Sequence, residues 1–160
     1  MEAYAGQQFV GIDLHRRRSV IVRTTDRGDP LETVRINNDV DSLTKVMARA
    51  GVGPEVVLEA TYGWYWAADV LQELGASTHL AHPLGVKAFG YRRVKNDVRD
   101  ATDLADLLRM GRLPEAWIAP PATRELRAGS APGQAGGAAV RLQVRGARGA
   151  GQVRRPGADV

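Results

Sequence analysis

The sequence predicts an α/β protein in which three antiparallel strands are extended by parallel strands and helices flank the mixed sheet. Three β-type segments separated by short turns come first, over residues 8–14, 19–25 and 31–36. From residue 39 onward, helical periodicity alternates with short apolar strands, a pattern typical of parallel pairing. With 160 residues, 44% of them hydrophobic, the chain is long enough to bury the core of one domain.

The elements follow in order along the chain. Arg16 to Arg18 form a short basic turn between the first two strands, and Asp26 to Pro30 has turn chemistry before the third. A helix is expected from Asp39 to Gly51, with one apolar face made of Val40, Leu43, Val46, Met47 and Ala50. The later elements are expected at residues 55–60 (strand), 64–74 (helix), 77–81 (strand), 84–89 (helix) and 97–110 (helix).

Composition excludes several classes of protein. The chain has no cysteine, which excludes disulfides, thiolate nucleophiles and cysteine-ligated zinc. It has no apolar run long enough for a membrane span and no signal segment, so we expect a soluble, cytoplasmic protein without a membrane partner. The net charge of +4 comes from residues 121–160, which hold 7 of the 22 Lys and Arg but only 2 of the 18 acids.

That basic segment is rich in Gly, Ala, Arg, Pro and Gln, and it has no Ile, Met, Phe, Tyr or Trp after Ile118. Such a segment buries too little apolar surface to offset its ordering entropy. We therefore expect a folded domain over residues 8–120, the start of a helix over 121–127 and a disordered tail over 128–160.

Four acids stand where an α/β sheet presents functional groups. Asp13 interrupts the first apolar strand, Glu59 ends a buried strand, and Asp97 and Asp100 open a helix three residues apart. An ionised carboxylate in an apolar strand needs either water or a cation. Four carboxylates suit hard divalent ions, which support phosphodiester chemistry.

Taken singly, each acid has a simpler explanation. Asp13 can lie at a wet strand end, Glu59 near the Gly63 turn, and Asp97 can be a helix cap with Asp100 a solvated first-turn acid. His15 and His82 are more often loop or solvent-facing residues than ligands. Asp103 and Asp106 continue a solvated helix face, Trp64 to Trp66 pack a helix on the sheet, and Arg16 to Arg18 form a solvated turn or contact nucleic acid.

The order and wording of the motifs resemble the DEDD transposases of the IS110 family. The motifs are Gly11-Ile12-Asp13-Leu14-His15, Leu58-Glu59-Ala60-Thr61 with Gly63 and Trp66, and Lys95-Asn96-Asp97-Val98-Arg99-Asp100-Ala101 with Leu104-Ala105 and Leu108-Arg109. The match runs from about Phe9 to Leu126. Two departures, Asn96 where Thr is common and Tyr62 where Gly is common, remove no carboxylate.

The resemblance implies a RuvC-like domain of ribonuclease H type with Asp13, Glu59, Asp97 and Asp100 as catalytic acids that bind Mg²⁺, or Mn²⁺. It implies insertion-sequence DNA as substrate, a structured guide RNA as partner and homo-oligomeric assembly in intact relatives. Those relatives continue through a helical linker into a second domain with a serine nucleophile. This chain stops before it, so we expect it to be inactive in transposition alone.

A frameshift is one explanation for the tail. Read one nucleotide later, the codons of Ala128 to Ala139 permit a helical, family-like linker, so out-of-frame residues are expected from near Arg127. Sequencing the locus tests this hypothesis, and a shifted frame without serine-domain coding would contradict it. A natural low-complexity tail is the alternative.

Two other functions stay open. Sugar kinases of the actin-like superfamily also begin with Gly-Ile-Asp on a first strand, but they follow it with glycine and small hydroxyl residues that cradle phosphate. Here Arg16 to Arg18 follow instead. The second alternative is a non-enzymatic remnant that binds nucleic acid.

Overall fold

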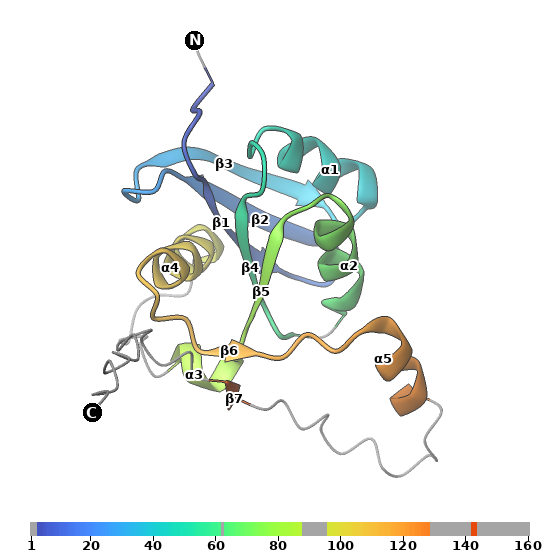
Figure 1. The fold of residues 1–160 in the computed structure, drawn as a ribbon. Coiled ribbons are helices and arrows are strands. Elements are labelled where there is room, and N and C mark those ends of the chain that lie inside the picture. The colour runs from blue at the N-terminus through green and yellow to red at the C-terminus, as the bar shows by residue number, and fades with distance from the viewer. Residues whose placement is uncertain (1–2, 62, 88–95, 129–141, 144–160) are drawn as a thin grey trace, which may run out of the picture.

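The computed structural model describes residues 3–61, 63–87, 96–128 and 142–143. Its centre is a seven-stranded mixed sheet in the order β3-β2-β1-β4-β5-β6-β7 (Figure 1). The first five strands are β1 (Phe9–Leu14), β2 (Arg18–Thr24), β3 (Pro30–Asn37), β4 (Glu55–Glu59) and β5 (Ser77–Ala81). β1, β2 and β3 are antiparallel, β4 is parallel to β1, and β5 is parallel to β4. The predicted mixed sheet is confirmed.

Two short strands complete the sheet and were not expected from the sequence. β6 (Glu115–Ala116) pairs antiparallel with β5, and β7 (Leu142–Gln143) pairs antiparallel with β6. Two residues are too few for a hydrophobic period to mark a strand. The rest of the tail predicted to be disordered lies outside the described residues, apart from residue 128 at the end of a helix.

Helices cover both faces of the sheet. α1 (Val40–Ala48) and α2 (Tyr65–Glu73) lie on one face, and α4 (Asp97–Arg109) lies on the other (Figure 1). α3 (Pro83–Lys87) follows β5, and α5 (Pro121–Ala128) follows β6. Within the described part of the chain, no helix is both long enough and apolar enough to cross a membrane.

The apolar face that the sequence predicts for α1 is buried, with one exception. Asp39 caps the helix by accepting a 2.7 Å hydrogen bond from the Ser42 amide, and Leu43, Val46 and Met47 are buried. Val40 does not belong to the buried face, because it is 53% exposed at the first position of the helix.

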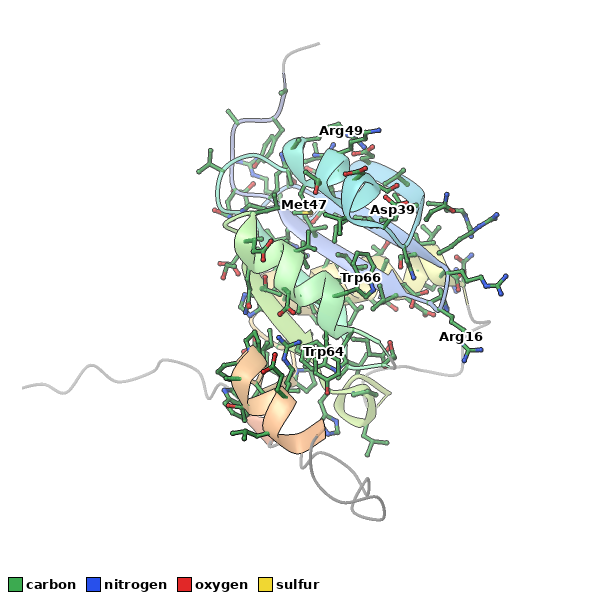
Figure 2. The ribbon with its side chains drawn as sticks, turned by 90° about the vertical axis from the view of Figure 1, so that its right-hand side faces the viewer. Arg16, Asp39, Met47, Arg49, Trp64 and Trp66 are labelled. Atoms are coloured by element: carbon green, nitrogen blue, oxygen red, sulfur yellow. The ribbon has the colours of Figure 1, made fainter. Side chains whose placement is uncertain are left out.

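α5 begins where the sequence predicts a helix, and it contacts α2 through Arg124. The Arg124 guanidinium lies 2.6 Å from the Asp69 carboxylate, and its Cζ atom lies 4.8 Å from the centre of the Tyr65 ring. Figure 2 shows Trp64 at the end of α2 that faces α5. That α5 begins a linker to a further domain stays a prediction.

The two sides of β1 bury different elements. Val10, Ile12 and Leu14 share a buried cluster with residues of α1 and α2. Gly11 faces α4 so closely that an added Cβ would lie 1.9 Å from the Ala101 carbonyl oxygen. Glycine is therefore required at this position, since only a strand without a side chain allows α4 to approach it. Residue 13 alternates to the same side as residue 11, toward α4.

Candidate metal centre

β1 carries Asp13 into the space between the sheet and α4. The residue is only 7% exposed, so the alternative in which it lies at a wet strand end is wrong. Its partner across the strand pair, Val20 of β2, packs with Ala101 of α4, as does Val22, the partner of Gly11. Asp13 is thus a buried acid at the carboxyl end of a central strand, where α/β sheets commonly bind ligands.

β4 places Glu59 on the same face as Asp13. Ile12 is paired with Leu58 in the parallel register, so Glu59 occupies the level of the sheet that follows, beside Asp13. Val57, two residues before Glu59, packs with Leu104 of α4, which shows that this side of β4 faces α4. Glu59 is partly buried there.

α4 presents its first turn to the same edge of the sheet. Its N-cap is Asn96, whose side-chain oxygen accepts hydrogen bonds from the amides of Val98 at 2.9 Å and Arg99 at 3.5 Å. The alternative in which Asp97 is the cap is therefore wrong. Asp97 and Asp100 instead both lie in the first turn, where the helix dipole favours negative charge.

His15 joins the two halves of this cluster, although the sequence alone did not single it out. Its Nε2 atom lies 2.8 Å from Oδ2 of Asp13 and 3.2 Å from Oδ1 of Asp97. One donor atom from each of the three residues lies within 4.8 Å of the others. The sequence signal that could have identified His15 is its spacing from Asp13, because residues two apart in a strand project to the same side.

The electrostatics of the cluster are those of crowded acids. Burial raises the pKa of Asp13, and the charges of Asp97 and Asp100 raise it further, against the opposing effect of His15. Burial would lower the pKa of His15, but the charges and hydrogen bonds of Asp13 and Asp97 outweigh it and raise that pKa. Asp13 is thus destabilised as an anion despite its contact with His15, which a bound cation would relieve.

Exposed arginines lie on β3 and in the turn that follows β1 and His15. Arg35 of β3 reaches Asp97, with Nη1 3.8 Å from Oδ2. Arg16, Arg17 and Arg18 are exposed in and beside the turn from β1 to β2, and Figure 2 shows Arg16 extending from that end of the sheet. The predicted solvated basic turn is confirmed.

The acids farther along α4 do not join the cluster in the way that Asp97 does. Asp103 is exposed, and Asp106 contacts Arg109 of its own helix at 3.3 Å. Their exclusion from the site stays a prediction.

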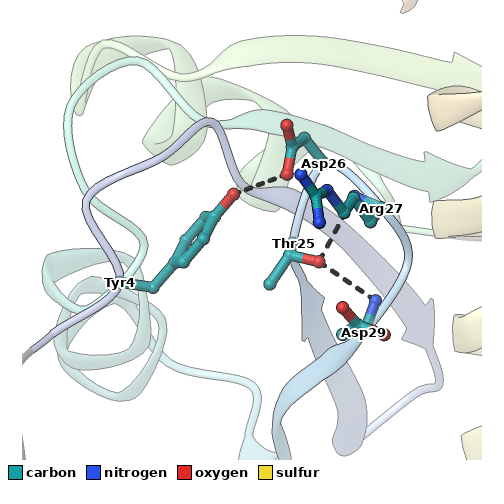
Figure 3. A pocket seen from close by; sticks show the side chains of 5 residues that line it. All are labelled: Tyr4, Thr25, Asp26, Arg27 and Asp29. Carbon is teal, nitrogen blue, oxygen red and sulfur yellow. Dashed lines mark hydrogen bonds between the residues drawn. The ribbon is translucent and has the colours of Figure 1, made fainter.

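A pocket elsewhere in the molecule is unrelated to these acids. It has a volume of about 300 Å³ and is lined by Tyr4, Thr25, Asp26, Arg27 and Asp29 (Figure 3). Phe9 at the start of β1 pairs with Thr24, so this pocket lies at the amino end of β1, opposite Asp13. The Tyr4 hydroxyl donates a 2.6 Å hydrogen bond to Asp26 across it.

Comparison with known families identifies the domain. The family model of the IS110 DEDD transposases, described as "Transposase", matches residues 10–132. This chain belongs to the IS110 family of DEDD transposases. Its sheet, with three antiparallel strands extended by β4 and β5 and helices on both faces, is the RuvC-like arrangement of ribonuclease H type that the sequence motifs imply for this family.

Solved structures to which this chain is similar include RuvC of T. thermophilus in complex with a Holliday junction substrate. This match has 15% identity and a TM-score of 0.49, and it covers 68% of this chain and 99% of that one. The ethanolamine utilization protein EutJ from Carboxydothermus hydrogenoformans matches at 15% identity and a TM-score of 0.38, covering 56% of this chain and 43% of that one. None of the curated proteins compared matches this IS110-family chain. Because both TM-scores lie below 0.5, membership of the family rests on the family model.

Proposed function

We propose that this domain performs divalent-metal-dependent phosphodiester chemistry on DNA and that Asp13, Glu59, Asp97 and Asp100 hold the metal, Mg²⁺ or Mn²⁺. One observation carries the proposal: a buried acid of the central strand and the first turn of α4 meet at the carboxyl edge of the sheet, with Asp13 and Asp97 in contact with the same His15 nitrogen. Membership of a transposase family agrees with DNA as the substrate.

The chemistry of the donors fits a hard divalent ion. Carboxylate oxygens are the preferred protein ligands of Mg²⁺ and Mn²⁺. Asp13 faces the negative charges of Asp97 and Asp100 while removed from water, and its raised pKa expresses that cost. A divalent ion, when bound, activates a water or hydroxyl for attack on phosphorus and stabilises the leaving oxygen.

In this proposal the fold positions the four acids, and nearby arginines provide positive charge for DNA. Asp13 and Glu59 are fixed by neighbouring parallel strands, whereas Asp97 and Asp100 depend on how closely α4 packs against Gly11. The exposed arginines beside the cluster would bind backbone phosphates on either side of the reacting one. A structured guide RNA and homo-oligomeric assembly remain predictions from the family resemblance.

Metal binding and DNA cleavage test this proposal separately. We expect calorimetry to show Mg²⁺ or Mn²⁺ binding to the intact chain, weakened at least about tenfold by Asp13→Asn, which keeps the side-chain shape and removes the charge. Asp41→Asn is the matched control, because Asp41 is an exposed first-turn acid of α1 on the other face of the sheet. Its metal affinity should equal that of the wild type.

Cleavage is then measured on branched and single-stranded DNA with and without Mg²⁺ or Mn²⁺. Cleavage that requires the metal and is lost in Asp13→Asn supports the enzyme. DNA binding without cleavage, in a chain that binds metal, would favour the non-enzymatic alternative. ATP binding by calorimetry would instead favour the relationship to sugar kinases, and failure to bind either metal would contradict the site itself.

A further inference from the structure

His15 occupies an unusual place among the acids of the candidate metal centre. The same ring atom, Nε2, faces Oδ2 of Asp13 at 2.8 Å and Oδ1 of Asp97 at 3.2 Å. A ring nitrogen carries at most one proton, so it can donate a good hydrogen bond to only one of the two oxygens. Two carboxylate oxygens thus converge on a single ring nitrogen.

The distances also match those between the ligands of one metal ion. In an octahedral site with bonds of about 2.1 Å, neighbouring ligand atoms lie about 3.0 Å apart, which the two contacts of Nε2 bracket. One donor atom each of Asp13, His15 and Asp97 lies within 4.8 Å of the other two, against about 4.2 Å between opposite ligands of such an ion. A metal ion would therefore fit among these three side chains after they draw together slightly.

Hydrogen bonds hold the backbone of His15 in place. Its amide donates to the Arg18 carbonyl at 3.2 Å, and its carbonyl accepts from the Asn38 side chain at 2.5 Å. Asn38 in turn accepts a 2.6 Å hydrogen bond from Ser19. These contacts fix the backbone from which the ring of His15 projects. The His15 side chain is 44% exposed, so an ion can reach it from solvent.

We propose that His15 is a direct ligand of the metal ion, through Nε2, together with Asp13 and Asp97. The proposal rests on the metal centre proposed above and adds a nitrogen to its oxygen ligands. Imidazole favours transition metals, whereas Mg²⁺ favours oxygen. This chain therefore binds Co²⁺ and Mn²⁺ in preference to Mg²⁺, and His15 is the residue that sets the preference.

Calorimetry with Co²⁺ and with Mg²⁺ tests the selectivity. We expect His15→Ala to weaken Co²⁺ binding by about tenfold or more, and Mg²⁺ binding by less than about threefold. His15→Gln keeps a polar side chain of similar reach and should behave as His15→Ala does. His82→Ala is the matched control, because His82 is a partly buried histidine outside the cluster and contacts the Gly85 amide.

Electron spin echo spectroscopy of bound Mn²⁺ provides a readout independent of affinity and activity. Coupling to a ¹⁴N nucleus is expected in the wild type and in His82→Ala, and its absence is expected in both His15 variants. Equal weakening of Co²⁺ and Mg²⁺, or Mn²⁺ bound without nitrogen coupling, would overturn the role of His15 while leaving the carboxylate site in place. A wild-type chain that binds none of these ions would overturn both proposals.

Discussion

Two histidines of this domain, His15 and His79, each contact two carboxylates, but they do so in different ways. In the open cluster (Asp13, His15 and Asp97), one ring nitrogen faces both acids and the histidine is 44% exposed. In the closed cluster (Glu55, His79 and Glu115), Nε2 contacts Glu55 at 2.5 Å and Nδ1 contacts Glu115, and the histidine is 9% exposed. Each cluster therefore places one histidine between two carboxylates, but in a different arrangement.

The difference lies in which ring nitrogens are used. In the closed cluster each ring nitrogen of His79 has its own carboxylate partner, so this cluster joins β4, β5 and β6. In the open cluster a single nitrogen, Nε2 of His15, contacts both Asp13 and Asp97. The closed cluster is suited to holding strands together, and the open cluster is suited to receiving a cation.

The largest expected effect comes from Gly11, because α4 carries Asp97 to the open cluster across this glycine. Gly11→Ala places a methyl group 1.9 Å from the Ala101 carbonyl, so α4 has to move away from β1. We expect the free energy of unfolding in urea to fall by about 3 kcal/mol, at the upper end for overpacked cores. Metal affinity should fall in the fraction that stays folded.

Gly53→Asn is the control for Gly11→Ala. Gly53 has a φ of +59°, a conformation that Asn tolerates, and an added Cβ there meets no atom within 4 Å. Its stability and metal affinity should stay close to those of the wild type. An unchanged stability of Gly11→Ala would mean that α4 does not pack on β1 as described.

The closed cluster is expected to matter for stability alone. His79→Leu removes the imidazole from between two carboxylates, and we expect the free energy of unfolding to fall by about 2 kcal/mol, less than for a fully buried pair because Glu55 remains 32% exposed. Adding Glu115→Gln should restore part of that loss. Calorimetry should find metal affinity unchanged, and a loss as large as that of Asp13→Asn would erase the distinction between the clusters.

The smallest effect is a dependence of stability on pH in the open cluster. The raised pKa of His15 means that the folded state binds its proton more tightly than the unfolded state does. The resulting stability is fully present below the unfolded pKa of about 6.5, and it is lost as pH rises through the folded pKa. Because His15 is nearly half exposed, solvent screening should keep the effect below about 1 kcal/mol.

Thermal unfolding with a chelator, between about pH 6 and pH 9, measures this effect in the metal-free protein. The slope should be absent in His15→Gln and present in His82→Ala. A wild-type stability that rises with pH across this window would show that His15 is not held by Asp13 and Asp97.

Sequence patterns predicted most of this fold because its long elements repeat a clear hydrophobic period. β1 through β5 and helices α1, α2 and α4 lie within a few residues of their expected bounds. β6 was not predicted, because two residues are too few to show a hydrophobic alternation. The same brevity hides the contact between Glu115 and His79, which depends on where the chain returns after α4.

The candidate site was predictable in part. Asp13 stood out because a carboxylate interrupts an apolar strand, and Asp97 and Asp100 because they open a helix. His15 did not, because a histidine after a strand is ordinary until its distance to another element is known. Only the packing of α4 on Gly11 supplies that distance.

The packing of α4 on Gly11 also determines when, during synthesis, the proposed metal site can form. Asp13 lies on β1, the first strand of the chain. Asp97 comes after β2, β3, β4 and β5 have all been synthesised. During synthesis the amino-terminal part emerges and begins to fold first. Asp13 and Asp97 can meet only when α4 has been made and has docked on β1, so the proposed metal site cannot form on a nascent chain until most of the domain has been synthesised.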